Sequence, residues 1–379
     1  MRIMYVVRTL HPMGGIERTL TDKANWLVNH GHEVIFVTYN QGDDEIFFTL
    51  NKGIQVQDLG CSIFSLYKYP VCSRFFYYIS LCKKFRSRFL QVERFFSPDV
   101  IVVPIPNAED FIWDIVEVTH GKKVIVESHV AFDKVFIGKS FTDRFLYFFY
   151  SPIRAIRKVD LMVCLTERDA FCWRQHGVKK VLISPNPITS YGDCLDNVDK
   201  ESNRILAVGR LTSQKRFDRL IEAFSLVAGT YPNWHVDIFG DGELRGNLEN
   251  QIKENNLDGR VIIHCQSKEI YLEYWRSQFL VLSSDYEGFG LVITEAMACG
   301  IPVVATDCPF GPSEIIEDGK TGLLAKMDAK DLADKMEWMM THDEERRLMG
   351  VNAHQAAARF RKEIIMPQWE EAYLCVIKS

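Results

Sequence analysis

The sequence predicts an α/β protein made of two doubly wound parallel-sheet domains that face each other across a cleft. The chain has 379 residues, of which 47% are apolar and 25% are charged, and these values suit two ordinary globular domains. In addition, short runs of β-branched residues alternate with helix-length segments in the first half and again from residue 204. Strands that are joined by helical crossovers in this way form parallel sheets.

The N-terminal half opens with a strand–helix–strand unit. Arg2–Val7 predicts a strand, and Glu17–Asn29 predicts a helix that ends before Gly31. The next strand, His32–Tyr39, holds four apolar residues in succession, which indicates burial on both faces of the sheet. Further strands are predicted at residues 99–103, 122–128 and 159–165. We place the first domain at residues 1–188.

The same alternation starts again in the second half, which we place at residues 189–362. Its strands are predicted at Ile205–Gly209, Trp234–Phe239, Val261–Cys265, Phe279–Ser284 and Pro302–Thr306. The helices between them are predicted at Phe217–Tyr231, Leu244–Asn256, Ile270–Gln278 and Gly290–Cys299. We expect the remaining residues, 363–379, to form a helix that is interrupted at Pro367 and packs back on the first domain.

Charge and cysteine content exclude several classes of protein. The chain carries 45 Lys and Arg against 50 Asp and Glu, a net charge of −5. Residues 1–190 hold 24 basic and 19 acidic residues, whereas the remainder hold 21 and 31, and this acidic half argues against a nucleic-acid partner. The ten cysteines form no Cys-x2-Cys pair, which favours reduced thiols in a cytoplasmic protein over a disulfide or zinc framework. No apolar run approaches the length of a membrane span.

Two glycines, Gly14 and Gly15, lie between the first strand and the first helix. The amides at a helix start have no partner within the helix and can bind an anion such as a phosphate. The alternative, which is commoner for an isolated glycine pair, is a tight turn without any ligand. The dinucleotide motif Gly-x-Gly-x-x-Gly is absent, because Gly240-Asp241-Gly242 has its next glycine one position late, at 246. This absence argues against a nicotinamide or flavin site.

Two cations follow the first strand of the second domain. The predicted strand ends at Gly209, Arg210 and Lys215 come next, and a helix begins near Phe217. This spacing places both cations above the end of the strand and beside a helix start. Arg210 could bind a diphosphate through its planar fork and Lys215 as a point charge. The alternative is a pair of solvated surface cations.

The segment from residue 284 to 305 has the pattern of strand, glycine loop, helix and strand. Gly288 and Gly290 allow the backbone to approach a ligand closely, and the helix start after them offers amides to an anion. Glu287 lies before this helix and Glu295 lies on it, eight residues further along. Two carboxylates could bind the hydroxyl groups of one polyol, which favours sugar chemistry over redox chemistry. Each glutamate alone is more typical of a solvated helix surface.

Together these motifs resemble the family 4 retaining glycosyltransferases of the B-type fold. The resemblance implies two Rossmann-like domains around a nucleotide-sugar cleft, and it extends from residue 3 to about residue 325. It is dense in the second domain and sparse between residues 40 and 120. The segments that carry it are Gly14–Arg18, Val208–Lys215, Phe239–Gly242, Glu287–Glu295, Ala296–Val304 and Ser313–Ile316.

The resemblance implies roles for individual residues. The catalytic set would be Arg210 and Lys215, which stabilise the departing nucleoside diphosphate, with Glu287 holding the donor sugar. His129, after a predicted strand, would lie beside the transferred sugar, although a buried or surface histidine without a catalytic role is the alternative. Glu295 would bind the ribose hydroxyls. The remaining donor-binding residues would be Gly14, Gly15, Gly209, Gly240, Gly288, Phe289, Gly290 and Leu291.

The resemblance also implies a reaction in which the anomeric configuration is retained and no metal or other cofactor is needed. The segment 307–314 resembles the version found in transferases that build bacterial surface polysaccharides, several of which use UDP-linked sugars. We therefore expect a hexose or N-acetylhexosamine donor linked to UDP, and a glycan or lipid-linked acceptor. Cys265 stands near the base, where family members usually have a glycine. A nucleotide-sugar epimerase or hydrolase, a nicotinamide dehydrogenase and a non-enzymatic sugar-binding protein are the alternatives.

Residues 64–96 form a basic and aromatic stretch, with seven Lys and Arg, one acid, Glu93, and eleven Phe and Tyr. Its apolar residues recur at steps of three and four, which predicts a helix with one apolar face. This face could pack on the sheet of the first domain. It could instead bring the protein to an anionic membrane, as a peripheral protein on its inner face. The apolar positions are Phe75, Tyr78, Cys82, Phe85, Phe89, Val92 and Phe96.

Overall fold

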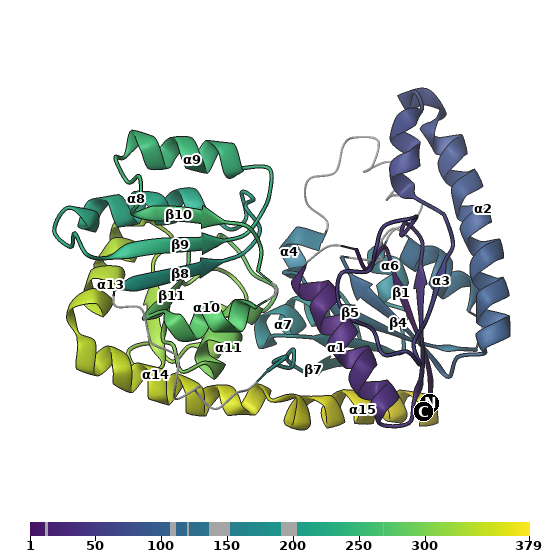
Figure 1. Cartoon of the computed structure of the whole chain (residues 1–379). Helices are drawn as coiled ribbons and strands as arrows, with labels where there is room; N and C mark the ends of the chain where they lie inside the picture. The colour runs from purple at the N-terminus through teal and green to yellow at the C-terminus, as the bar shows by residue number, and fades with distance from the viewer. Residues whose placement is uncertain (12–13, 107–110, 120, 136–151, 191–202, 268) are drawn as a thin grey trace. The chain divides into compact units, whose positions relative to one another are not determined.

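A computed structural model of the chain shows two α/β units, each built on one parallel sheet (Figure 1). The first unit comprises Met1–Pro185 together with Ile365–Ser379, and the second comprises Asn186–Ile364. The predicted fold class is therefore confirmed. The structure describes residues 1–11, 14–106, 111–119, 121–135, 152–190, 203–267 and 269–379.

The first unit contains seven strands and the helices that cover them. The strands are β1 (Arg2–Val7), β2 (Glu33–Thr38), β3 (Gln55–Asp58), β4 (Val100–Ile105), β5 (Lys123–Ser128), β6 (Leu161–Cys164) and β7 (Val181–Ile183). The helices are α1 (Gly15–Asn29), η1 (Ile63–Lys68), α2 (Val71–Phe96), α3 (Ile112–Val118), α4 (Phe132–Val135), α6 (Pro152–Ile156), α7 (Glu167–Gln175) and α15 (Lys362–Lys378).

The second unit contains six strands. These are β8 (Arg204–Val208), β9 (His235–Phe239), β10 (Val261–His264), β11 (Phe279–Leu282), β12 (Val303–Thr306) and β13 (Gly322–Ala325). Its helices are α8 (Phe217–Ala228), α9 (Arg245–Glu254), α10 (Ile270–Arg276), α11 (Leu291–Ala298), α12 (Pro312–Ile315), α13 (Ala329–Thr341), α14 (Asp343–Ala357) and η3 (Ala358–Phe360).

Both sheets have the doubly wound strand order. The order is β3-β2-β1-β4-β5-β6-β7 in the first unit and β10-β9-β8-β11-β12-β13 in the second. Every pairing is parallel, so all strands of one sheet end at the same edge. The direction of winding reverses between β1 and β4 and again between β8 and β11. Ligands of such sheets bind outside the carboxyl ends of the strands at this reversal.

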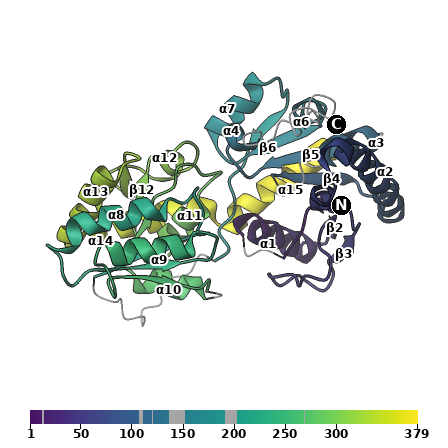
Figure 2. The ribbon, with the colours of Figure 1, turned by 90° about the horizontal axis from the view of Figure 1, so that it is seen from above.

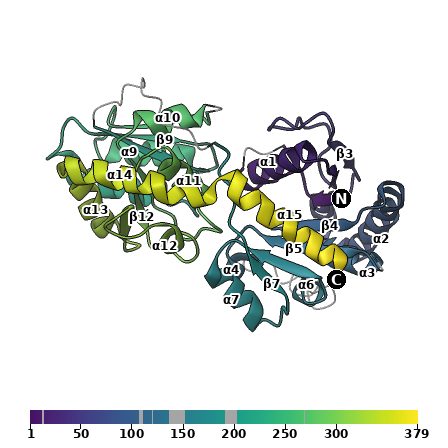
Figure 3. The same ribbon diagram turned by 90° about the horizontal axis from the view of Figure 1, so that it is seen from below.

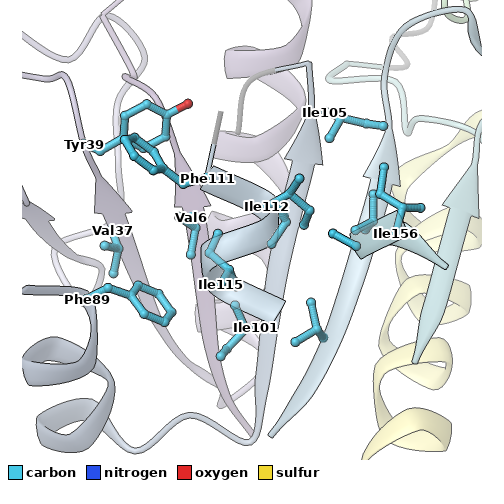
Figure 4. Close-up of a cluster of buried hydrophobic side chains, with 14 of the residues drawn as sticks. Val6, Val37, Tyr39, Phe89, Ile101, Ile105, Phe111, Ile112, Ile115 and Ile156 are labelled. Carbon is cyan, nitrogen blue, oxygen red and sulfur yellow. The ribbon is translucent and has the colours of Figure 1, made fainter. Parts of the chain in front are cut away.

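Successive side chains of the buried strands point to opposite faces of the first sheet. On one face, Val6, Val37 and Ile101 pack with residues of α2 and α3, including Phe89 and Ile112 (Figure 4). The opposite face carries α1 and α15, which Figures 2 and 3 show from above and below. Because both faces are covered, the central strands hold successive buried apolar residues, as predicted for Val34–Val37 of β2.

Helix α2 packs its predicted apolar face into the first unit. Tyr78, Cys82, Phe85, Phe89 and Phe96 are buried. The ring of Phe85 lies parallel to that of Phe111, with centroids 4.1 Å apart, and it also contacts the rings of Tyr39 and Phe89. The apolar stripe of the 64–96 stretch therefore forms part of the core.

Helix α15 differs from the prediction, because it does not break at Pro367. Proline is the sixth residue of this helix, so it removes one backbone hydrogen bond beyond the unpaired first turn. Ile365, Met366 and Trp369 around it are buried. Packing of these side chains on the first unit outweighs the local cost of the proline.

Three short strands were absent from the sequence-based prediction. β3 is an edge strand whose sequence, Gln-Val-Gln-Asp, is polar and exposed. β7 and β13 have three and four residues, close to the shortest strands that proteins use. Each is defined mainly by pairing with a neighbour, which periodicity within one segment does not reveal.

Within the described part of the chain, no helix has the length and hydropathy needed to cross a membrane.

We expect Phe85→Ala to destabilise the protein by about 3–5 kcal/mol, because it empties a fully buried aromatic cluster. The matched control is Phe95→Ala on the same helix, where the ring is 82% exposed and its removal should leave stability nearly unchanged. Urea unfolding of the two variants and the parent checks this. Equal midpoints for both variants would contradict the packing of α2.

Candidate active site

The site in the second unit lies at the carboxyl ends of β8 and β11, where the winding reverses. Gly209, Arg210 and Lys215 follow β8, and the loop from Ser283 to Gly290 follows β11. Since β8 and β11 are paired neighbours in the sheet, the two loops lie side by side. Asp285 N donates to Gln214 O at 2.9 Å, which joins them directly.

Lys215 and Glu287 form an ion pair in this site. Lys215 Nζ lies 2.7 Å from Glu287 Oε1, and the two side chains are 14% and 7% exposed. Ser284 Oγ donates to the same carboxylate oxygen at 2.6 Å, and Ser283 Oγ donates to the backbone oxygen of Lys215 at 2.8 Å. These contacts hold the ammonium group in one place. The structure thus joins two residues to which the sequence assigned separate roles.

Arg210 is exposed at the same edge of the sheet. Its turn is fixed by the backbone, because Leu211 N donates to Asp241 O at 2.8 Å and Thr212 N donates to Arg210 O at 2.8 Å. Among the residues that the structure describes, no ion pair involves the Arg210 guanidinium. An anion could therefore bind it without first displacing a carboxylate.

Arg216, Arg219 and Asp285 also belong to this site, and the sequence analysis missed them. Arg216 has a left-handed backbone (φ 49°) and donates to both Asp218 and Asp285. Arg219 donates to Asp285 at 2.6 Å and to the backbone oxygen of Ser283 at 2.8 Å. The hydrogen bonds that Arg216 donates to Asp218 and Asp285 raise the pKa of its guanidinium. This arrangement has a signal in the sequence: two arginines at the start of a helix, and an aspartate directly after the neighbouring strand.

Several glycines of the motifs are required by close backbone contacts. A Cβ atom on Gly240 would collide with the carbonyl oxygen of Gly209, and one on Gly311 would collide with that of Phe289. Gly290 caps α11 with φ 99°, a conformation that side chains disfavour. These glycines let the loops of the site pack against one another, whatever they bind.

The residues around the start of α11 differ in exposure. Gly288 is half-buried, whereas Phe289 is buried and its ring packs edge-on against Phe360 with centroids 5.6 Å apart. Glu295 lies on α11 and is 3% exposed. Its carboxylate accepts a hydrogen bond of 2.9 Å from the hydroxyl of Tyr274. Glu295 is thus held from one side by α10.

The remaining predicted residues lie in the first unit. Gly14 caps α1, Gly15 is its first residue, and the carboxylate of Glu17 folds back against Gly14. His129 directly follows β5 and its ring is almost completely buried, with Nε2 3.0 Å from Glu127 Oε2. Within the described ranges, no three His, Cys, Asp or Glu side chains come together to hold a metal ion.

Two family models match the chain in succession. "Glycosyltransferase Family 4" matches residues 13–190, and "Glycosyl transferases group 1" matches residues 196–356. An uncharacterized glycosyltransferase of Haemophilus influenzae is 27% identical over 330 residues, which are 86% of this chain and 86% of that protein. The amylovoran biosynthesis glycosyltransferase AmsD of Erwinia amylovora is 33% identical over 173 residues, 45% of this chain and 48% of that protein.

A solved structure has the same fold. A mutant form of TarM of S. aureus, in complex with Fondaparinux, alpha-GlcNAc-glycerol and UDP, has a TM-score of 0.80 at 16% identity over 100% of both chains. Two Rossmann-like units give the chain the B-type fold, and the two family models identify it as a glycosyltransferase. The chain belongs to the family 4 glycosyltransferases.

We expect Gly240→Ala to destabilise the second unit by about 1–3 kcal/mol, because the added methyl group meets the Gly209 backbone rather than a movable side chain. Gly246→Ala on α9 is the control, since nothing lies within 4 Å of a Cβ there and alanine favours a helix. Thermal unfolding compares the two. A Gly240→Ala variant as stable as Gly246→Ala would refute the close contact.

Proposed function

We propose that this protein transfers a hexose or N-acetylhexosamine from a UDP-linked sugar to a glycan or lipid-linked acceptor, with retention of configuration and without a metal ion. The observation that carries the proposal is the pair of cations at the carboxyl edge of β8, with Arg210 exposed and Lys215 held by Glu287. The UDP in the S. aureus TarM complex supports the choice of donor.

The cations suit the charge that develops during transfer. As the bond between the sugar and the diphosphate breaks, negative charge collects on the departing phosphate oxygen. Arg210 can donate two parallel hydrogen bonds to such a phosphate, and Lys215 Nζ adds a positive charge in a position fixed by Glu287. Preorganised positive charge of this kind can replace the electrostatic role of a metal ion.

The donor has further binding groups in this proposal. Glu287 would bind the hexose, the amides of Gly288–Leu291 the distal phosphate, and Glu295 the ribose hydroxyls. Gly240 lets its loop contact the backbone carbonyl oxygen of Gly209 at the end of β8, where a side chain would not fit. In the first unit, Gly14 and Gly15 would offer amides to the diphosphate, and His129 would contact the transferred sugar.

We assign retention of the anomeric configuration to a displacement on one face of the sugar ring. The acceptor oxygen forms its bond to the anomeric carbon on the face from which the diphosphate leaves, and the acceptor's proton passes to the departing phosphate oxygen. This route requires no protein nucleophile. The alternative activities, an epimerase or a hydrolase on the same scaffold, are not favoured, because both halves of the chain match transferase families.

The test is a donor panel in which release of UDP, GDP or ADP is followed with lipid-linked glycans as acceptors. We expect release from a UDP-sugar, dependent on acceptor and unaffected by EDTA. Arg210→Ala should lower kcat about 100-fold or more with the fold intact, because its side chain is exposed. Lys330→Ala, an exposed change on α13, is the control. Product configuration by NMR decides between retention and inversion.

Three outcomes would count against the proposal. Release without an acceptor would indicate a hydrolase. Loss of turnover in EDTA that Mg²⁺ restores would remove metal independence. Normal rates in both Arg210→Ala and Lys215→Ala would remove the assignment of the cations.

We also propose that the tip formed by η1 and the start of α2 binds an anionic membrane, where a lipid-linked acceptor would be found. Phe64, Phe76 and Tyr77 are 52%, 72% and 42% exposed there, and Tyr69 stacks on Tyr77 with centroids 3.5 Å apart. The outward face of α2 carries exposed basic residues such as Lys83. Glu93, the single acid of this stretch, is buried beside Lys122. Exposed aromatic rings beside exposed basic residues suit an anionic lipid surface.

Phe76→Ser with Tyr77→Ser should weaken binding to phosphatidylglycerol vesicles about tenfold or more, because both rings would enter the interface. Phe171→Ser is the control, since that ring is 59% exposed on α7 away from the basic face. Co-sedimentation measures the bound fraction, which should also fall as salt rises. Equal binding to phosphatidylcholine and phosphatidylglycerol, or no effect of the double change, would refute the surface.

A further inference from the structure

A buried polar cluster in the first unit surrounds Glu127, the penultimate residue of β5. Its carboxylate is fully buried. Oε1 accepts hydrogen bonds from Lys23 Nζ of α1 and from the Tyr373 hydroxyl of α15, both at 2.6 Å. Oε2 lies 3.0 Å from His129 Nε2. One carboxylate therefore joins two helices to the histidine that follows the strand.

The charge states within the cluster follow from burial and pairing. Burial lowers the pKa of Lys23 to about 8, which leaves its ammonium charged at neutral pH. Burial alone would raise the pKa of Glu127, but the Lys23 charge and the hydrogen bond from His129 lower it to about 2. Burial lowers the pKa of His129, so its ring is neutral. Glu127 is thus an acceptor only.

This fixes the tautomer of His129. A carboxylate can accept a hydrogen bond but cannot donate one, so the hydrogen atom of the neutral ring is on Nε2. Nδ1 then keeps its lone pair. Nδ1 is buried and has no hydrogen-bond partner among the described residues. The ring therefore offers an acceptor, not a donor, to any group that reaches Nδ1.

Helix α15 holds Glu127 from the other side. Since Tyr373 donates to Glu127, the Tyr5 hydroxyl, 3.0 Å away, donates to Tyr373. Lys23 Nζ lies 3.1 Å from the centre of the Trp369 ring, a cation–π contact. Trp369 Nε1 in turn donates to the backbone oxygen of Pro185 at 3.2 Å. Glu127 thus has little freedom to turn away from His129.

We infer that Glu127 is a positioning residue that keeps His129 in the Nε2–H tautomer, so that Nδ1 accepts a hydrogen bond from a hydroxyl group of the bound sugar. The tautomer follows from the contacts within the first unit. Its effect on sugar transfer rests on the proposed function. In the opposite tautomer, Nδ1–H would be a donor. The sugar hydroxyl would then have to accept from Nδ1–H and direct its own hydrogen to another group.

The direct test is the ¹⁵N spectrum of the imidazole nitrogens in protein labelled at histidine, with the His129 signals assigned by their loss in His129→Gln. We expect protonated Nε2 and unprotonated Nδ1 in the parent. Glu127→Gln should give a mixture of tautomers, because a side-chain amide can both donate and accept. Tyr373→Phe is the matched control, since it removes a hydrogen bond from Oε1 and leaves Oε2 and the tautomer unchanged.

Glu127→Gln leaves the Lys23 ammonium buried without a counter-charge, which threatens the fold. The double variant Lys23→Met with Glu127→Gln removes both charges and gives a second protein for the same spectrum. A protonated Nδ1 in the parent, or a pure Nε2–H tautomer in both the single and the double variant, would overturn the inference.

Kinetics test whether Glu127 acts through His129. We expect Glu127→Gln to lower kcat/KM about 10–100-fold, the range for residues that orient a functional group. In a His129→Ala background, Glu127→Gln should lower kcat/KM little further, because the group that Glu127 orients is absent. Additive losses would assign Glu127 a purely structural role. A parent without turnover on any donor would instead contradict the proposed function, and the spectrum would still decide the tautomer.

Discussion

The parallel direction of every strand within each sheet is the constraint on which the site depends. Parallel pairing brings the carboxyl ends of β8 and β11 to one edge, so loops that are about 70 residues apart in the chain lie in contact. Lys215 can then reach Glu287, and Asp285 can bind the arginines at the start of α8. Gly240, after β9, and Gly311, after β12, allow their loops to approach the β8 and β11 loops at backbone distance.

Two lysine–carboxylate pairs that are buried or nearly so connect stability with chemistry in this protein. Lys23 with Glu127 in the first unit, and Lys215 with Glu287 in the second, each place a lysine ammonium within 2.7 Å of a carboxylate. Removing one partner of such a pair leaves a desolvated charge, which is costly. The pairs also restrict side chains that would otherwise move freely, so the same contacts that satisfy burial orient His129 and fix the ammonium of Lys215.

Much of the architecture could be predicted because hydrophobic runs report burial directly. The strand at Arg2–Val7 was predicted with the bounds that the structure shows, and the fold class followed from the order of strands and helices. The family was indicated by the resemblance of the motifs. The short edge strand Gln55–Asp58 was missed because it is polar and depends on its neighbour for definition. Pro367 was interpreted as a helix break because local propensity takes no account of the buried contacts of Trp369.

By itself, the sequence determined the two sheets, the positions of Arg210, Lys215 and Glu287 at strand ends, and the family to which the chain belongs. These features depend on the order of residues within short segments. Tertiary structure alone decided which charges are paired, that Glu295 is buried against Tyr274, and that α15 completes the surroundings of Glu127. Such contacts join residues as far apart in the chain as Tyr5 and Tyr373, a separation of 368 positions, and local periodicity carries no information about distances of that kind.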